Sequence, residues 1–514
     1  MKQSMGFMRR HWLLTMTPTA LAVALLLSFA GRSEGQDREA SPGIIGIDPI
    51  PVPDCGDADA PVTPCNIVIN KELMITDLCV VEDPVRTRWT AVGADPNALG
   101  AWTFGKLMAS IGGFPDVTTD PVGLSNFVRN WLGEWLVDQT QTSIDCISDA
   151  RPAMQSFLID RWEEVSGSET LNMKLAPFRL LAIVNRIDLR RNTVYGAGNA
   201  GEARFVFGVL NINPQDPNPD NWSQTQFTVI LEYIQPASTC EEVKTWADRW
   251  HALGSIPFGA TFNKELQKIT DDFAGFNIAP GRPNGSSISQ VRTNEIELGD
   301  PWELREFHLN PLLTVIPAPL EQTTVALTVD LRHNNTDLLA DWMTQNEPDI
   351  LAETHTIPLV FNGECFAAIS SLNPLDTWRA PGFDCTETRH KFALNNCNGC
   401  HAPETDTRFL HVFPRNMGQE SDLSRFLTGT NPINDVTCTP PGSVTRVFND
   451  LKRRALDLCD LLMSECEIDI FRREASSGGP EMSQDGGETG AQRETPTNQD
   501  LFENAPHSPG NRVH

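Results

Sequence analysis

The placement of cysteine constrains this chain more than any other feature of its sequence. All twelve cysteines follow an apolar stretch from Leu21 to Ala30, which Arg9 and Arg10 precede. A basic start, an apolar run and small residues after it are typical of a secretory signal peptide. Most of the cysteines should then form disulfides in an oxidising compartment. We expect a signal peptide over residues 1–35 and a protein in the periplasm or outside the cell.

The strongly negative net charge of the chain argues against negatively charged binding partners. At -27 for the whole chain, the surface should repel phosphate backbones and anionic lipid headgroups. We therefore expect no nucleic acid partner and no stable membrane insertion once the signal is cleaved. Retention of the signal as an anchor stays open, because the apolar run together with Trp12 to Leu14 approaches the length that spans a bilayer.

Helical and strand-like patterns alternate irregularly through the middle of the chain. Apolar residues at helical spacing predict helices over residues 122–139, 151–165, 240–253 and 260–276. Runs rich in β-branched and aromatic residues predict strands over 178–189, 203–212, 225–234, 323–331 and 357–369. The runs at 203–212 and 225–234 should pair as antiparallel neighbours. Because the order is not a clean βαβα repeat, we expect an α+β fold.

Composition divides the sequence after the signal into four parts. A linker rich in Pro and Gly covers residues 36–53, and a large mixed domain of unknown function with antiparallel strands and helices covers 54–381. A small, mainly α-helical segment follows over 382–473. It ends in an amphipathic helix within residues 443–465. The acidic residues 474–514 hold too little apolar surface to fold and should form a disordered tail.

The small segment carries the pattern "NNCNGCHAPE", from Asn395 to Glu404, with two cysteines three positions apart and a histidine next. Setting this pair aside leaves ten cysteines, which is enough for five disulfides. Connectivity cannot be deduced from sequence. We expect pairs of cysteines close in the sequence, such as Cys55–Cys65 and Cys365–Cys385.

Through "CNGCH" the segment resembles the c-type cytochromes of bacteria; the rest of the chain resembles only large secreted bacterial proteins, which implies no mechanism. The resemblance implies one covalent haem c, with Cys397 and Cys400 forming thioethers to the haem and His401 as the proximal iron ligand. Electron transfer with a redox partner of unknown identity would follow from it.

Two other interpretations of the pattern stay open. Cys397 and Cys400 form a disulfide in the first, which suits a secreted protein and leaves His401 incidental. In the second they hold half of a zinc site, whose other ligands would be drawn from more distant cysteines. These are Cys438, Cys459 and Cys466. Export favours haem over both, since covalent haem attachment requires it.

The second axial ligand is less clearly marked. His411 lies ten residues past His401, and ten extended residues reach roughly 33 Å, enough to pass round a haem edge. We expect His411 to be the distal ligand, with Met417 and Met463 as alternatives. A vacant sixth position would instead point to ligand or peroxide chemistry.

Three further patterns fail on their context. Residues 196–201, "GAGNAG", match a dinucleotide fingerprint but precede a strand, so we interpret them as a hairpin loop. Residues 216–227 lack the Gly and the Glu of a calcium loop. The carboxylates within 295–306 are more simply explained as a half-exposed strand than as a glycosidase pair.

The sequence therefore predicts an exported haem c protein in electron transfer. One alternative is a haem-dependent redox enzyme, such as a peroxidase-like oxidoreductase. Another is a haem-free secreted binding or glycan-active protein in which Cys397–Cys400 is a disulfide.

Overall fold

The computed structural model describes residues 55–91, 93–141, 146–190, 199–311, 317–373 and 376–466. All of them belong to one compact unit, residues 51–514. The predicted signal peptide, linker and acidic tail lie outside the described residues. Within the described ranges, no helix combines the length and apolar character needed to cross a membrane.

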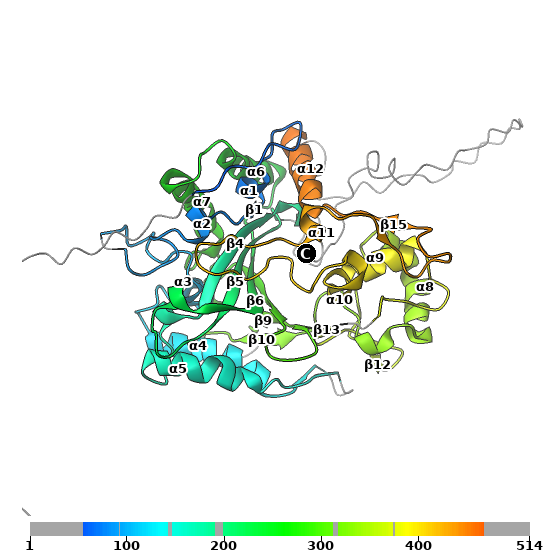
Figure 1. The fold of residues 1–514 in the computed structure, drawn as a ribbon, viewed down its shortest axis with the longest axis horizontal. Coiled ribbons are helices and arrows are strands. Elements are labelled where there is room, and N and C mark those ends of the chain that lie inside the picture. The colour runs from blue at the N-terminus through cyan, green and yellow to red at the C-terminus, as the bar shows by residue number, and fades with distance from the viewer. Residues whose placement is uncertain are drawn as a thin grey trace, which may run out of the picture. The chain divides into compact units, whose positions relative to one another are not determined.

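Nine strands of the described chain form one antiparallel sheet, which lies at the centre of Figure 1. The α+β class predicted from the sequence is confirmed. The main path of the sheet is β1 (Met74–Ile75), β4 (Phe178–Arg186), β5 (Glu202–Asn211), β6 (Ser223–Ile234), β7 (Ile288–Glu295), β8 (Glu303–Leu304) and β13 (Ser371–Leu372). Strand β9 (Glu306–Leu309) joins β7 to β10 (Leu320–Thr323). The predicted pairing of 203–212 with 225–234 is confirmed as β5 against β6.

The two faces of this sheet differ in polarity, because successive side chains in a strand point to opposite faces. On one face Phe205, Phe207, Leu231 and Val291 belong to the largest apolar core. On the other face the same strands present Arg204, Thr228, Glu232, Arg292 and Asn294. The apolar face of the sheet packs into the large core. The polar face must be covered by another segment of the chain.

Helices α3 (Phe104–Ile111), α4 (Pro121–Gly133), α6 (Cys240–Leu253) and α7 (Ala260–Ala274) contribute to the large core. The last two match their predicted ranges within two residues. The predicted helix 122–139 ends earlier, at Gly133. The predicted helix 151–165 is a π-helical turn over Gln155–Ile159 followed by α5 (Asp160–Ser166). The N-terminal part adds the one-turn helices α1 (Ile69–Glu72) and α2 (Leu78–Val81).

Two strand predictions are wrong over much of their length. Residues 324–330 form no regular strand; Leu327 takes a left-handed conformation with φ of 55°, and the apolar side chains that suggested a strand are buried in small cores. Within 357–369 only β11 (Val360–Phe361) and β12 (Glu364–Cys365) are strands, joined at Asn362–Gly363. Both turn residues have positive φ, which an Asn-Gly hairpin requires.

Residues from the predicted haem segment cover the polar face of the sheet, as the yellow and orange elements of Figure 1 show. They form α9 (Glu387–Asn395), α10 (Cys397–Cys400), α11 (Arg425–Thr428), the hairpin of β14 (Ile433–Asn434) and β15 (Thr445–Arg446), and α12 (Asp450–Met463). Helix α8 (Asp337–Leu351) packs beside α9. Helix α12 starts at Asp450 because the side chain of Asn449 caps it. The division of the sequence at residues 381 and 382 stays a prediction.

Five disulfides use the ten cysteines outside the CxxCH pattern, as the count predicted. Their pairing corrects our expectation, since Cys55–Cys65 and Cys365–Cys385 are both wrong. The pairs are Cys55–Cys79, Cys65–Cys459, Cys146–Cys365, Cys240–Cys466 and Cys385–Cys438. Bridges across sequence separations as large as 394 residues depend on tertiary topology, which spacing alone does not reveal. Two of them attach the region of α12 to the N-terminal half of the chain.

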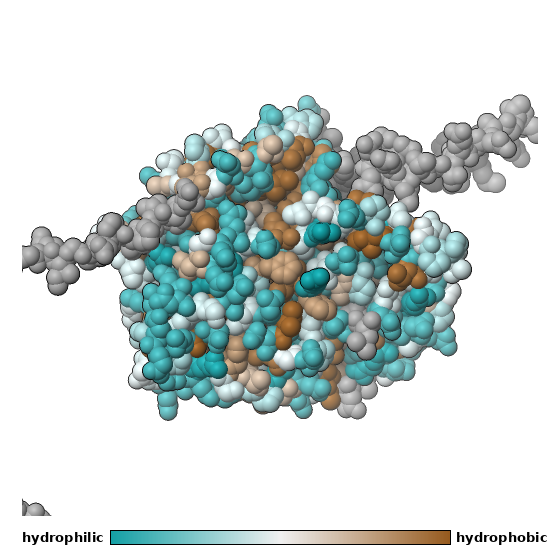
Figure 2. All heavy atoms as spheres, in the orientation of Figure 1, coloured by the Kyte–Doolittle hydropathy of each residue, from teal (hydrophilic) through white to brown (hydrophobic). Residues whose placement is uncertain are grey.

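The remaining short strands, β2 (Gln139–Thr140) and β3 (Ile147–Ser148), pair with each other. Figure 2 shows a mainly hydrophilic surface, in line with the excess of acidic residues, with apolar side chains gathered in a broken band down the middle of the face shown.

Candidate functional site

The CxxCH pattern lies on a tight junction between two helices. Helix α9 ends at Asn395, and the extended backbone of Asn396 turns the chain before the single turn of α10. Gly399 is required there, because a Cβ atom at this position would lie 2.0 Å from the carbonyl oxygen of Ala393. The chain then brings the amide of His401 within 2.8 Å of the Cys397 carbonyl. The glycine inside "CNGC" is thus explained by packing.

The asparagines of the pattern fix this turn to the rest of the molecule. Asn396 accepts a hydrogen bond at 2.8 Å from the backbone amide of Val329. Asn398 accepts one at 2.9 Å from the indole of Trp378 and donates to the Leu372 carbonyl at 3.0 Å. Both asparagines are fully buried. Their amides satisfy backbone and indole groups that burial would otherwise leave unpaired.

A buried ion-pair network holds the loop that follows. Both carboxylate oxygens of Glu404 lie 2.9 Å from the guanidinium of Arg389, and His390 bonds to the same carboxylate. Arg389 also pairs with Asp435 at 2.9 Å. Burial acts to raise the pKa of Glu404, but the hydrogen bond from His390 and the charges of His390 and Arg389 lower it to about 2. The carboxylate stays ionised and joins α9 to the loop after α10.

The two sulfur atoms of the pattern take part in no disulfide. Cys397 and Cys400 are buried, at 1% and 0% exposure. Burial raises the pKa of the Cys397 thiol to about 11, so it is protonated at neutral pH. The structure therefore differs from the disulfide interpretation of the pattern.

His401 is oriented by its own loop. Its Nδ1 atom lies 2.6 Å from the carbonyl oxygen of Phe409, a residue held at a positive φ of 62°. A carbonyl only accepts, so Nδ1 carries the proton and Nε2 keeps its lone pair. The ring also stacks on Trp302 at 5.5 Å between centroids. Burial lowers the pKa of His401 to about 4, which keeps the imidazole neutral and able to bind a metal ion.

His411 lies directly against this histidine. The two rings are 4.3 Å apart between centroids, and Nε2 of His411 lies 3.6 Å from the sulfur of Cys400. Its Nδ1 is 2.8 Å from the hydroxyl of Ser424. Metal–nitrogen bonds of roughly 2 Å on each side would hold two trans imidazoles further apart than this. With the rings in contact, His411 would have to move to become the distal ligand, and that role stays a prediction.

The two methionine alternatives lie elsewhere. Met417 lines a second cavity, of about 1020 Å³ including open solvent, together with Trp102 and Phe104. Met463 is 62% exposed on α12. Met74 of β1 is buried in the same cavity as His401, and the sequence analysis missed it.

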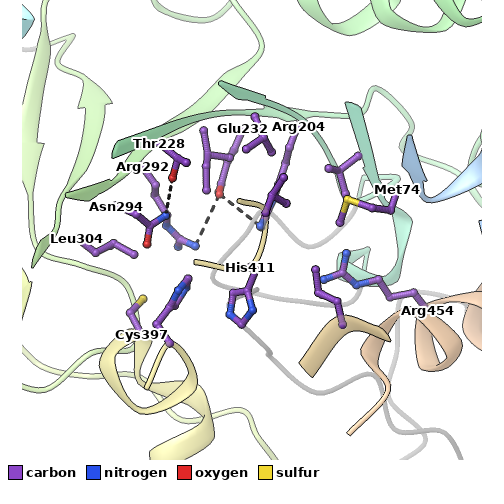
Figure 3. A pocket seen from close by; sticks show the side chains of 16 residues that line it. Met74, Arg204, Thr228, Glu232, Arg292, Asn294, Leu304, Cys397, His411 and Arg454 are labelled. Carbon is purple, nitrogen blue, oxygen red and sulfur yellow. Dashed lines mark hydrogen bonds and ion pairs between the residues drawn. The ribbon is translucent and has the colours of Figure 1, made fainter. Parts of the chain in front are cut away.

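The cavity beside His401 lies between α10 and the polar face of the sheet. Its empty volume is about 630 Å³, counting open solvent. Figure 3 shows Cys397 and His411 on one side, with Arg204, Thr228, Glu232, Arg292 and Asn294 across from them. Apolar side chains complete the lining: Met74, Val184, Val206, Ile230, Leu304, Val412 and Leu427. Such a mixture of apolar walls and a few convergent polar groups is typical of ligand sites.

The polar groups come from neighbouring rows of the sheet. Arg204 of β5 lies opposite Glu232 of β6, and Thr228 of β6 lies opposite Asn294 of β7. Sequence reasoning missed all of them, although the alternation within "ARFVFGVL" and "QVRTNE" carries the signal.

Ion pairs connect these side chains. Glu232 lies 3.4 Å from Arg204 and 3.8 Å from Arg292, and Arg292 lies 3.0 Å from Glu306. Burial acts to raise the pKa of Glu306, but Arg292 and His308 lower it to about 2. The acidic stretch 295–306 therefore contributes buried pairing groups here, which corrects the expectation of a half-exposed strand.

The cysteines that were expected to complete a zinc site with Cys397 and Cys400 are not available as ligands. Cys438, Cys459 and Cys466 all belong to disulfides. Within the described ranges no group of three or more His, Cys, Asp or Glu residues is arranged to hold a metal ion.

Comparison with known families, curated proteins and solved structures finds no match to this chain.

Proposed function

We propose that the chain is an exported protein that carries one covalent haem c and takes part in electron transfer. Cys397 and Cys400 would form the thioethers, and His401 would bind the iron through Nε2. The observation that carries the proposal is the orientation of His401. Its Nδ1 is occupied by the Phe409 carbonyl, while the ring lines a cavity beside two cysteines outside the disulfides.

Two features of the residues present support the proposal. A metal-binding histidine usually donates its other ring N–H to a carbonyl or carboxylate, which fixes its tautomer and orientation. The Phe409 carbonyl does this for His401. Thioether formation consumes two thiols, and these two cysteines are the only ones of the twelve outside the five disulfides.

A bound haem would supply an iron that gains and loses one electron. The chain would set the reduction potential of that iron through burial and hydrogen bonding. His401 and the cysteines are buried against Trp302 and the sheet, which excludes water from the proximal side. The excess of acidic residues would favour a redox partner with a positively charged surface.

The proposal is tested by expressing the full chain in a bacterial periplasm that contains haem c maturation machinery. We expect a Soret band that persists after denaturation in acid and organic solvent. The double variant Cys397→Ala/Cys400→Ala should lose it while keeping its yield, since neither residue takes part in a disulfide. A wild-type protein without denaturation-resistant haem would overturn the proposal and favour the haem-free alternative.

A haem-dependent redox enzyme is the second candidate, and one observation favours it. The cavity wall across from His401 carries buried charged and amide groups where an electron carrier needs only apolar cover. Polarity and hydrogen-bond donors on that side of a haem decide between electron transfer and ligand chemistry.

A further inference from the structure

The second cavity, which Met417 lines, shares no lining residue with the cavity beside His401. It is bounded by the residues that follow α2, the start of α3, the first residues of β4 and the loop 217–220. Its volume of about 1020 Å³, including open solvent, is enough for a small organic molecule, since ligand pockets typically measure roughly 300–1,000 Å³.

Aromatic side chains form the inner wall of this cavity. Trp102, Phe104, Phe178 and Phe207 all line it, and all are buried. The ring of Phe104 stacks on that of Phe178 at 3.7 Å between centroids and meets Phe207 edge-on at 5.8 Å. The indole of Trp102 donates to the hydroxyl of Thr270 at 3.0 Å, so its one polar group is already satisfied. The wall therefore favours a ligand with a flat apolar body.

A half-buried tryptophan lies where the cavity meets solvent. Trp89 lines the cavity beside the exposed Lys174, whose Nζ lies 5.5 Å from the centre of the indole ring. The backbone of Gly100 lies against this ring. A Cβ atom on Gly100 would be 2.9 Å from three atoms of the ring, and its φ of 68° suits a glycine. Gly100 thus supports Trp89 as a second flat surface of the cavity.

Arg179 is a buried cation that lines the same cavity, at 7% exposure. Its Nη1 donates to the Arg415 carbonyl at 3.0 Å, and its Nη2 lies 3.0–3.2 Å from carbonyl oxygens of the loop 219–222. Among the residues that the structure describes, none accepts a hydrogen bond from its Nε, and no carboxylate forms an ion pair with it. Burial and the charge of Arg415 lower the pKa of Arg179 to about 10, so the guanidinium is charged at neutral pH. A buried charge without a counter-ion is costly, and an anion bound in the cavity would reduce that cost.

The two carboxylates that line the cavity already have partners. Glu82 pairs with Arg415, and Asp220 pairs with Arg88 at 3.2 Å. Lys174 forms no ion pair with any carboxylate of the described residues. A ligand that entered would therefore meet two cationic side chains that lack a carboxylate partner, one inside the cavity and one at its edge. This arrangement favours a negatively charged group on the ligand.

We propose that the second cavity binds a small aromatic carboxylate, with its ring against Trp89 and Phe104 and its carboxylate beside Arg179. This inference does not depend on haem attachment, and it gives the chain a binding activity separate from electron transfer. The Nε–H group of Arg179 would supply a charge-assisted hydrogen bond to the ligand. Lys174 would add attraction at the edge of the cavity.

The test is isothermal titration calorimetry of the full chain with naphthoate, beside naphthamide substituted at the same ring position. We expect the wild type to bind one naphthoate per chain. Naphthamide should bind at least about 10-fold more weakly, because it has the same shape without the charge. Arg179→Gln should weaken naphthoate binding by about 10- to 100-fold, the loss of one charge-assisted hydrogen bond, and should change naphthamide binding much less.

Two further variants separate the ring contacts from the charge. Trp89→Ala should weaken the binding of both probes by about 10-fold, because an aromatic surface is lost. Lys174→Gln should weaken only naphthoate binding, by about 2- to 5-fold, and the effect should fade in concentrated salt because Lys174 is exposed. Lys268→Gln is the matched control. Lys268 is an exposed lysine of α7 that pairs with Glu265 and lines neither cavity, so its loss should leave both affinities at the wild-type values.

Four outcomes would overturn the inference. The first is a folded wild type without saturable naphthoate binding, and the second is naphthamide binding as tight as that of naphthoate. The third is unchanged naphthoate affinity in a folded Arg179→Gln variant, and the fourth is unchanged affinity in Trp89→Ala. If Arg179→Gln does not fold, the comparison of the two probes and the Trp89→Ala variant decide the matter. Covalent haem is measured separately by the Soret band, so none of these outcomes alters the test of the proposed function.

Discussion

The Nδ1 atom of His401 lies 2.6 Å from the carbonyl oxygen of Phe409. This contact places the proton of the imidazole on Nδ1, and the ring lines the cavity. The cysteine spacing by itself is compatible with several chemistries, and this contact gives the His401 ring the tautomer that the proposed ligand role needs.

Removing the His401 ring should separate haem attachment from iron ligation. His401→Ala should keep covalent haem, since both thioether positions are intact, but its Soret band should shift and added imidazole should restore the wild-type position. His251→Ala, a half-exposed histidine that pairs with Glu72, serves as control and should leave the spectrum unchanged. An unchanged spectrum in His401→Ala would contradict iron ligation by His401.

Gly399 should tolerate no side chain. In Gly399→Ala the new Cβ would lie 2.0 Å from the Ala393 carbonyl, so α9 and α10 must move apart, at a cost of about 1–3 kcal/mol of unfolding free energy. Haem content should fall with it. The control is Gly133→Ala at the end of α4, where the added Cβ meets nothing within 4 Å and the φ of -66° is helical. That change should stabilise the fold by about 0.5–1 kcal/mol, measured by chemical denaturation.

The Glu404 network should be important for stability. Glu404→Ala leaves Arg389 and His390 buried without this partner, and breaking a buried pair costs about 3–5 kcal/mol. Glu387→Ala on the same helix removes a pair with Arg446 in which Glu387 is 48% exposed, and should cost at most about 1 kcal/mol. Similar losses in the two variants, measured by denaturant titration, would contradict the structural role of Glu404.

The same carboxylate predicts a dependence of stability on pH. The pKa of Glu404 is lowered from 4.5 to about 2 in the folded state, so the folded state binds this proton less readily than the unfolded state does. Its stabilising contribution is present above about pH 4.5 and is lost as the pH falls through 2. The wild type should therefore lose stability over this range faster than Glu404→Gln. Parallel stability curves for the two proteins would contradict this.

The Cys65–Cys459 disulfide should contribute more to the free energy of unfolding than the Cys55–Cys79 disulfide. Removing Cys65–Cys459 as a Ser pair releases a loop across 394 residues, whereas Cys55–Cys79 spans 24. In the loop-entropy account the longer loop costs more, within a typical range of about 2–5 kcal/mol for a native disulfide. Thermal unfolding of the two double-serine variants measures the difference. A larger loss for the Cys55–Cys79 variant would oppose it.

The sequence was informative where the pattern is local. Runs rich in β-branched and aromatic residues predicted the strands at 203–212 and 225–234, which pair as β5 and β6. The haem roles that the residue spacing suggested for Cys397, Cys400 and His401 stay predictions. Disulfide pairing between distant parts of the chain could not be predicted from the sequence, and for this reason the expected partners of Cys55 and Cys365 were wrong. The polar side of the site was missed for a related reason: alternation tells that Arg292 and Asn294 share a face, but only the tertiary fold brings that face to His401.

The most direct test of the account is intact-mass spectrometry of the full chain, purified from a periplasm that matures haem c, followed by peptide mapping. The account predicts one added haem mass, located on the peptide that holds Cys397 and Cys400, and absent from the Cys397→Ala/Cys400→Ala variant. An unmodified chain, in cells that attach haem to a co-expressed control cytochrome, would contradict it.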